Sequence, residues 1–396
     1  MKGEYMEYLL MFQDEEVAKL DIDMHKNAPQ LVDKLTPISP ELFPFALRYA
    51  PDAYKLDETA NWLKKRCIPT HRKNFKQLTS VLAGNPLQWV LNSHGISAQD
   101  GFWLQKVGES LKWKDVNCFD RKFDYSIGNL TFDISSPEYI YDTPDLSTGG
   151  LLPKTWRMKE DKSLWLIKYG SAPDFDEPYN EVTATKILAK VCTVDFVRYS
   201  LIDVQGKICS LCENFMTPDL ELVTAAELSR TEYKPEYVTT TMHLKERCRT
   251  FRIPGYKQFL DNMFMVDYII GNMDRNLNNF GFLYDVASGL FIGPAPIYDN
   301  GTSFWESDFN MTQDELTIRD KQKARAVVND MSRHFTPNLK PLEHIDQILF
   351  ETLGNLYATE ELTYIAERLR TRIDLTEKYL ARHQVHDRHQ NHDIER

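Results

Sequence analysis

The sequence predicts an α+β fold: an N-terminal accessory domain, then a bilobal body with a small antiparallel-sheet lobe and a mainly α-helical large lobe. Two observations support this. Apolar segments bounded by turns, such as 164–168 and 207–216, indicate strands. Further along, apolar residues recur at helical spacing, as at Phe259, Met263 and Val266. A chain of 396 residues with 42% hydrophobic residues is long enough to bury such a core.

We expect three segments: the accessory domain at 1–125, the small lobe at 126–215 and the large lobe at 216–396. In the first, EYLLMFQDEEVAKLDIDM predicts a strand pair, and SPELFPFALRYA and LDETANWLKKRC predict short helices. We hypothesise that this domain contacts a substrate protein or a regulator. The polar tail at 381–396 carries histidines at every third position, which predict a solvated helix end rather than a metal site: His383, His386, His389 and His392.

The small lobe is expected to begin with a glycine-containing turn formed by Ser147, Thr148, Gly149 and Gly150. Glycine lets backbone N–H groups approach a phosphate closely, so this turn predicts a nucleotide-phosphate site.

A buried strand is expected to follow and to end in Lys168, a cation that is costly among apolar neighbours unless it has a partner. Glu181 shares a helical face with Leu188 and Val191, so it points toward the sheet and is expected to pair with Lys168. Each residue also has a simpler explanation. Lys168 would reach solvent at a strand end, and Glu181 would favour the helix dipole. Their order along the chain favours the pair.

Two more strands are predicted, VDFVRYSLI at 194–202 and KICSLCENFM at 207–216, with a turn at 204–207 between them. They complete an expected five-stranded sheet. A hinge segment would follow at its end, and its backbone groups are expected to meet an adenine edge: Glu213, Asn214 and Phe215.

The large lobe carries the most informative spacing, in which Asp274, Asn279 and Asp299 follow one another. Phosphoryl transfer needs a carboxylate beside the accepting hydroxyl and oxygen ligands that hold Mg²⁺ against nucleotide phosphates. Asp274 is the expected base, and Asn279 and Asp299 are the expected metal ligands. This spacing is the chemistry of a kinase site.

The elements around this triad are also predictable. The apolar face that includes Phe259 and Ile270 predicts a buried helix leading into the loop. FGFLYD at 280–285 and LFIGPAPIYD at 290–299 predict a hairpin that leads to Asp299.

With these residues in order, the chain resembles the HipA-like kinases, bacterial serine/threonine kinases distantly akin to eukaryotic protein kinases and inositide kinases. The resemblance runs through roughly the last two thirds of the chain. It rests on an S-x-x-G-x-x-x-K loop, a strand lysine, an N-E helix start, an N-x-D-x-x-x-x-N loop and a Y-D metal acid. The loop is matched by Ser147, Gly150 and Lys154, and the strand lysine by Lys168. The helix start is matched by Asn180 and Glu181. The N-x-D-x-x-x-x-N loop is matched by Asn272, Asp274 and Asn279, and the metal acid motif by Tyr298 and Asp299.

The resemblance implies a protein-kinase-like fold, dependence on ATP and Mg²⁺, and transfer to a serine or threonine hydroxyl of a protein. It also implies autophosphorylation at Ser147, which in that family ejects the loop and silences the enzyme. Such kinases often act as toxins beside a small DNA-binding antitoxin, so an antitoxin partner is a further expectation.

One residue departs from the family. Asn276 stands where a histidine is usual, and an amide donates a hydrogen bond but carries no proton charge. This disfavours an inositide or small-molecule kinase, which stays the weaker alternative. The other alternative is a nucleotide-binding pseudokinase or regulatory module.

Composition narrows the partners. A net charge of −11 argues against direct binding of nucleic acid, which needs clustered Lys and Arg. Apolar runs of membrane-spanning length and a secretory pattern at the N-terminus are both absent from the sequence. We therefore expect a cytoplasmic protein without membrane contact.

Overall fold

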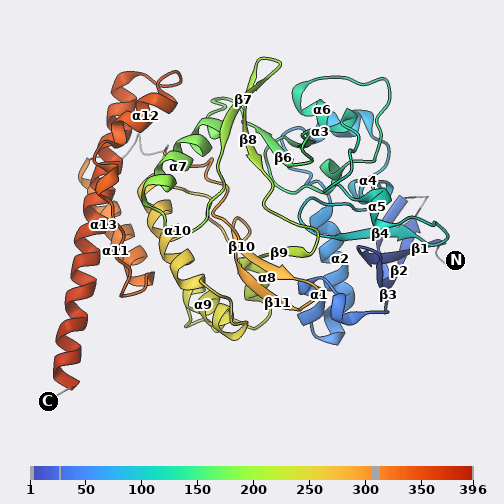
Figure 1. Ribbon diagram of the computed structural model, residues 1–396, viewed down its shortest axis with the longest axis horizontal. Coiled ribbons are helices and arrows are strands. Elements are labelled where there is room, and N and C mark those ends of the chain that lie inside the picture. Colours follow the sequence, from blue (N-terminus) through green and yellow to red (C-terminus); the bar gives the residue numbers. More distant parts are fainter. Residues whose placement is uncertain (1–3, 26–27, 305–312, 395–396) are drawn as a thin grey trace. The chain divides into compact units, whose positions relative to one another are not determined.

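The computed structural model describes residues 4–25, 28–304 and 313–394. The chain divides into two compact units (Figure 1). The first unit consists of Met1–Asp174, Ile202–Tyr233 and Phe282–Ile292. The second consists of Phe175–Leu201, Lys234–Gly281 and Gly293–Arg396.

The N-terminal part of the first unit contains a four-stranded antiparallel sheet in the order β3-β2-β1-β4. Its strands are β1 (Glu4–Phe12), β2 (Glu15–His25), β3 (Ala28–Pro37) and β4 (Phe102–Lys106). The predicted strand pair is confirmed by β1 and β2. Short helices surround this sheet: α1 (Phe45–Tyr49), α2 (Lys55–Arg66), α3 (Phe75–Val81), α4 (Pro86–Asn92), α5 (Trp113–Val116) and α6 (Ser126–Asn129).

The second sheet of this unit has the order β5-β6-β8-β7, so four strands are described in place of the expected five. They are β5 (Lys154–Met158), β6 (Leu164–Tyr169), β7 (Ser200–Val204) and β8 (Lys207–Glu213). The strand predicted at 194–202 starts later, at Ser200, because Phe196 and Val197 bridge to Ile297 instead. Gln205 and Gly206, with φ angles of 58° and 78°, form the turn after β7. Two left-handed residues form the tight hairpin turn that matches strand twist.

The predicted hairpin is confirmed in a third sheet, ordered β11-β10-β9, with β9 (Leu220–Thr224), β10 (Gly281–Asp285) and β11 (Leu290–Pro294). Gly289 donates its backbone N–H to the carbonyl of Asp285 at 2.9 Å and closes the turn. Helix α8 (Ala225–Arg230) follows β9.

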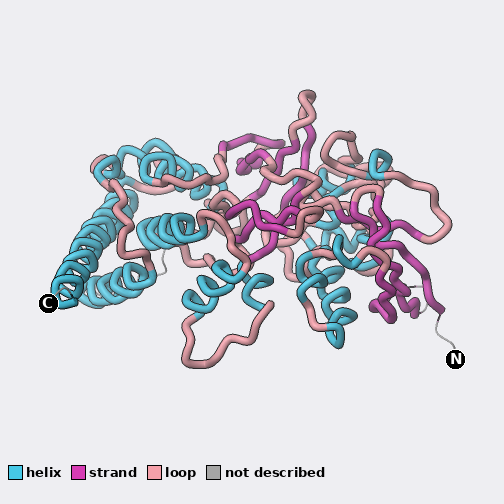
Figure 2. The backbone as a smooth tube through the Cα atoms, turned by 60° about the horizontal axis from the view of Figure 1, so that its bottom comes forward, coloured by secondary structure: helices cyan, strands magenta, loops and turns pink. Residues whose placement is uncertain are grey.

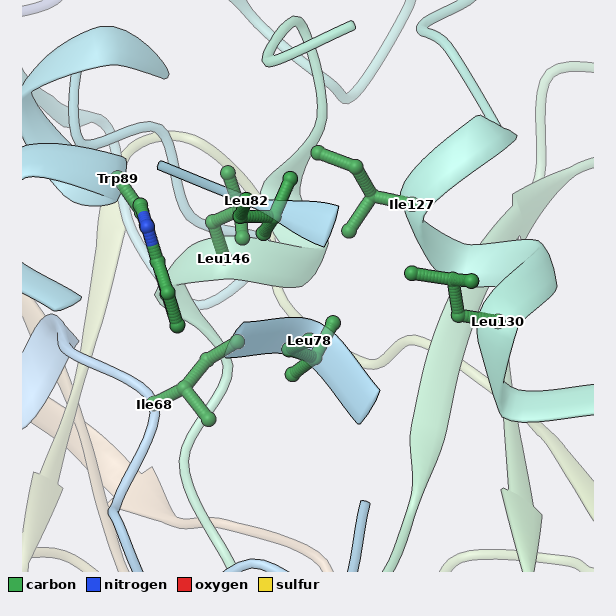
Figure 3. Packing of buried hydrophobic residues seen from close by; sticks show 7 residues of the cluster. All are labelled: Ile68, Leu78, Leu82, Trp89, Ile127, Leu130 and Leu146. Carbon is green, nitrogen blue, oxygen red and sulfur yellow. The ribbon is translucent and has the colours of Figure 1, made fainter. Parts of the chain in front are cut away.

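A buried apolar cluster joins the N-terminal helices of the first unit to the segment that precedes β5 (Figure 3). Leu146 lies in this cluster, 1% exposed, one residue before Ser147. Its other members are Ile68, Leu78, Leu82, Trp89, Ile127 and Leu130. The segment leading to the glycine-containing turn is therefore anchored by the N-terminal part of the chain.

The second unit is helical apart from loops and the ends of strands, as the cyan segments of Figure 2 show. Helix α10 (Tyr256–Ile270) confirms the predicted buried helix, with Phe259, Met263, Val266 and Ile270 all buried. The other helices are α7 (Glu177–Val191), α9 (Thr240–Thr250), α11 (Gln313–Asp330), α12 (Ile345–Leu353) and α13 (Thr359–Ile394). The side chains of the histidine-rich tail beyond His383 lie outside the described residues.

The α+β class with antiparallel sheets is therefore confirmed, while the bilobal arrangement stays a prediction. Across the part of the chain that the structure describes, every helix is too short or too polar to cross a membrane.

Candidate active site

The loop that carries Asp274 begins where α10 ends. Gly271 adopts a left-handed conformation with φ 67° and terminates the helix. Asn272 then donates its side-chain amide to the Asp267 carboxylate at 3.0 Å and accepts from the Asp274 backbone N–H at 3.1 Å. Asn272 thus fixes the backbone at Asp274 to the buried end of the helix.

Asp274 is exposed, and two amides hold its carboxylate. Asn276 donates to one oxygen at 2.9 Å, and Asn279 donates to the other oxygen at 2.9 Å. The Asn279 amide also donates to the Asp274 carbonyl at 2.7 Å. Because its nitrogen faces Asp274, its oxygen faces away and is oriented to accept a cation.

Asp299 has a backbone conformation that is unusual for a residue with a side chain, with φ 61°. Strained conformations of this kind cost roughly 1–3 kcal/mol and cluster at functional sites. Asn300, which follows, is buried and donates its backbone N–H to the Glu181 carboxylate at 3.0 Å. Asn180 donates to the Gly301 carbonyl at 2.9 Å. The N-E start of α7 therefore holds the backbone directly after Asp299.

Arg275 links the loop that carries Asp274 and Asn279 to the segment that carries Asp299. One of its nitrogens donates to the carbonyls of Asn279 and Tyr298, at 2.7 and 2.6 Å. Its guanidinium also pairs with the buried Asp267 carboxylate at 2.9 Å. Burial lowers the pKa of Arg275, but Asp267 and the nearby Asp299 carboxylate outweigh it, so the pKa is raised. One permanently charged side chain therefore ties the Asn279 loop to the segment that carries Asp299.

In the first unit, the glycine-containing turn lies between a short helix and β5. Ser147 is 3% exposed, and its hydroxyl has no hydrogen-bond partner among the residues that the structure describes. Thr148 accepts from the indole N–H of Trp156 at 3.0 Å. Asp145 accepts from the Trp156 backbone N–H and the Thr155 hydroxyl, each at 2.8 Å, and burial raises its pKa. Ser147 is thus inaccessible to a phosphate donor in this conformation.

Arg72, from the segment before α3, donates to the turn's carbonyls. It donates to Gly149 at 3.0 Å, to Gly150 at 3.2 Å, and to Thr148. Its guanidinium is buried, and this burial lowers its pKa to about 10 although Asp145 partly opposes the shift. Lys73 adds a backbone N–H to the Leu151 carbonyl at 3.1 Å.

Two lysines face each other beside this turn. Lys154 of β5 pairs in register with Lys168 of β6. Directly opposite residues share one face of the sheet, with Cβ atoms about 4.5–5.5 Å apart, and like charges there are destabilising. The Lys154 ammonium also lies against Gly150, where a side chain at that glycine would collide with it. Two ammonium side chains therefore come from neighbouring strands beside the glycine-containing turn.

The predicted hinge is only partly available for a ligand. The backbone N–H of Asn214 donates to the Leu164 carbonyl at 2.8 Å, and its side chain donates to Ala98 at 2.9 Å. Asn214 therefore extends the pairing of β8 with β6, and an adenine edge would have to use the other backbone groups of Glu213 and Phe215. Those contacts stay predictions.

The residues fit Mg²⁺ by donor type. Mg²⁺ is usually held by one or two protein oxygens together with substrate phosphates and water. Asn279 supplies an amide oxygen and Asp299 a carboxylate. Among the residues whose side chains are described, there is no group of three or more His, Cys, Asp or Glu residues that could hold a metal ion by themselves.

Protein-family models give no match, and neither do the curated proteins. Several solved structures are similar to the chain, among them these two. One is the proinflammatory kinase CtkA of Helicobacter pylori, at 19% identity and a TM-score of 0.44, covering 58% of this chain and 94% of that one. The other is the HipA, HipB and operator DNA complex of a Shewanella oneidensis MR-1 toxin–antitoxin system, at 13% identity and a TM-score of 0.46, covering 94% and 97%. We base the proposed function on the residues of the site, not on these two likenesses.

The structure brings Asp274, Asn279 and Asp299 into one network within the second unit, and the glycine-containing turn, Lys154 and Lys168 together within the first. The expected pair of Lys168 with Glu181 joins residues of different units and stays a prediction. Arg275 and Arg72 are not among the predicted site residues. Arg275 lies inside the motif, between Asp274 and Asn276, so its position could have drawn attention, whereas no local pattern marks Arg72.

Proposed function

We propose that the protein is an ATP- and Mg²⁺-dependent kinase that phosphorylates a serine or threonine hydroxyl of a protein substrate. The observation that carries this proposal is the amide of Asn279. It donates to Asp274 by its nitrogen and so presents its oxygen outward, while Arg275 ties its backbone to the segment of Asp299. A carboxylate base and two metal ligands in one rigid network are what phosphoryl transfer requires.

In this proposal each residue of the second unit has one role. Asp274 orients the accepting hydroxyl and takes its proton as the new phosphate ester bond forms and the bond from the γ-phosphorus to the β–γ bridging oxygen breaks, which releases ADP. Asn279 and Asp299 hold Mg²⁺, which would neutralise charge on the nucleotide phosphates. Asn276 and Asn272 keep the Asp274 carboxylate and backbone in place.

The first unit would bind the nucleotide. Lys168 clamps the phosphates, Lys154 adds a second positive charge from the neighbouring strand, and the glycine-containing turn contributes backbone N–H groups. Glu213 and Phe215 would meet the base of the nucleotide. Each lysine should matter for ATP affinity, because an ammonium group forms charge-assisted hydrogen bonds to phosphate oxygens.

The test is transfer of label from γ-labelled ATP, offered to the purified chain alone and with a cell lysate. Wild type should label itself or a lysate protein, and Asp274→Ala should reduce the rate of label transfer by about 10²–10⁴-fold. Asn278→Ala is the matched control, because Asn278 is exposed in the same loop and its side chain has no assigned role. Equal labelling by wild type and Asp274→Ala would overturn the role of Asp274.

A nucleotide-binding regulatory module is the second candidate, and one observation favours it. Both carboxylate oxygens of Asp274 already accept amide hydrogen bonds, so a hydroxyl would have to use the lone pairs that the two amides leave. Tight ATP binding by wild type without any label transfer would support this candidate against the kinase.

The toxin role and a DNA-binding antitoxin partner are proposed from the sequence resemblance alone. Expression should arrest growth, and Asp299→Ala should relieve the arrest. Normal growth of cells that express active wild-type protein would contradict the toxin role while leaving the kinase proposal intact.

A further inference from the structure

The direction of the backbone in the glycine-containing turn is set by a residue far away in the sequence. Arg72 donates to the carbonyls of Thr148, Gly149 and Gly150 with one guanidinium group. Three successive carbonyls therefore point toward one side of the turn. The left-handed conformation of Gly150, with φ 94°, makes this possible, because residues with a side chain rarely adopt it.

The opposite side of the turn follows from peptide geometry. In a planar trans peptide the carbonyl of one residue and the N–H of the next point in opposite directions. The N–H groups of Gly149, Gly150 and Leu151 therefore point away from Arg72, and none of them donates to another group of the described chain. Successive N–H groups aimed outward form an anion-binding concavity.

Two lysines lie beside this concavity. Lys154 lies against Gly150, and Lys168 lies opposite Lys154 across the strand pair. The buried Asp145 carboxylate is directed toward β5, where it accepts hydrogen bonds from Thr155 and Trp156. An anion with several negative oxygens, such as the triphosphate of a nucleotide, matches this surface.

We propose that Arg72 is a positioning residue for nucleotide binding: by holding three carbonyls of the turn, it aims the N–H groups of Gly149, Gly150 and Leu151 at the nucleotide phosphates. This inference rests on the proposed function. It also gives the N-terminal part of the chain a definite role, because Arg72 comes from residues 1–125 and neighbouring Phe75 and Leu78 pack around Leu146. Arg72 acts through the turn and does not itself touch the ligand.

The test compares Arg72→Met, which keeps the length and apolar stem of the side chain, with Arg66→Met. Arg66 is also a buried arginine of this segment, but it bonds Gly95 and Asp100 and stays away from the turn. Arg72→Met should raise the KM for ATP about tenfold or more while kcat changes less than about threefold, because uniform binding is lost. Arg72→Lys should fall between wild type and Arg72→Met, since a single ammonium group cannot hold three carbonyls. An unchanged KM in a folded Arg72→Met protein would overturn the inference.

A second measurement does not depend on catalysis. In a Ser147→Cys background, the rate at which a thiol reagent modifies position 147 is followed by mass spectrometry of that peptide. The added Arg72→Met change should raise this rate about tenfold or more, whereas Arg66→Met should not, because Arg72 bonds the turn around the buried position 147 and Arg66 does not. Equal rates in the two variants would overturn the inference. If wild type binds no ATP, the proposed function fails, but the labelling rates still decide whether Arg72 holds the turn.

Discussion

Glu181 accepts the backbone N–H of Asn300 at 3.0 Å, although the two residues are 119 positions apart in the sequence. This bond holds the residue that follows Asp299. Glu181 is also the expected partner of Lys168, so one carboxylate is assigned two roles. Substitutions can separate them, because a glutamine keeps an acceptor for the N–H but loses the charge.

We expect Glu181→Ala to destabilise the fold by about 1–3 kcal/mol, since it leaves the buried Asn300 N–H without its partner. Glu181→Gln should recover most of this stability in urea denaturation. If Glu181 also orients Lys168, Glu181→Gln should nevertheless lose label transfer almost as fully as Glu181→Ala. Full activity in Glu181→Gln would show that the charge is not needed and that holding Asn300 is its role.

Arg275 should be the most costly single loss in the second unit. Arg275→Met leaves the Asp267 carboxylate buried without its cation, and breaking a buried pair typically costs about 3–5 kcal/mol. Adding Asp267→Asn removes the uncompensated charge and should restore part of the stability. Urea denaturation of wild type, Arg275→Met, Asp267→Asn and the double variant gives the coupling free energy between the two side chains. A loss below about 1 kcal/mol for Arg275→Met would contradict the pairing.

Removal of a metal ligand should appear in the Mg²⁺ dependence. Asn279→Ala removes the amide oxygen, and we expect the Mg²⁺ concentration for half-maximal transfer to rise about tenfold or more. Titration of Mg²⁺ at saturating ATP measures this. Asn278→Ala should leave the Mg²⁺ dependence unchanged, and an equal shift in both variants would point to a disturbed loop rather than a lost ligand.

Glu221 predicts a pH dependence of stability. Burial raises the pKa of its carboxyl well above the ordinary value, although the Phe45 backbone N–H, which donates at 2.7 Å, partly opposes the shift. A raised pKa favours the folded state while the group is protonated. Its contribution is therefore complete below the unfolded pKa of about 4.3 and is lost as the pH rises through the raised pKa.

Glu221→Gln should accordingly raise Tm by a few degrees at pH 8 and change it little at pH 4.5, because the amide is neutral and still accepts from Phe45. Glu16→Gln removes an exposed carboxylate of the same unit and serves as the control. An equal change in Tm at both pH values would show that Glu221 does not titrate in the expected way.

Features carried by local pattern could be predicted from the sequence. The apolar face of 259–270 and the turn residues between Asp285 and Gly289 define α10 and the hairpin without tertiary information. The same is true of the spacing from Asp274 to Asn279. The shifted start of β7 shows the limit, because Phe196 and Val197 bridge to Ile297, a distant residue that no local pattern identifies.

Long-range contacts could not be predicted. Arg72 lies 76 residues from Thr148, and only the packing of α3 and Leu146 brings them together. Arg275 is visible in the motif, but the roles of its five hydrogen bonds depend on where Asp267, Asn279, Tyr298 and Asn300 lie in space. The hydrogen bond from the Asn214 N–H to Leu164 of β6 could not be predicted either, because it depends on how β6 and β8 pair.

The left-handed backbone of Asp299 has a consequence for directed evolution of this protein. Glycine adopts that conformation without strain, so Asp299→Gly should relieve the backbone strain even as it removes the proposed metal ligand. A library selected for heat resistance alone would therefore enrich a protein that has lost its chemistry. Selection for thermostability and selection for activity should therefore favour different residues at position 299.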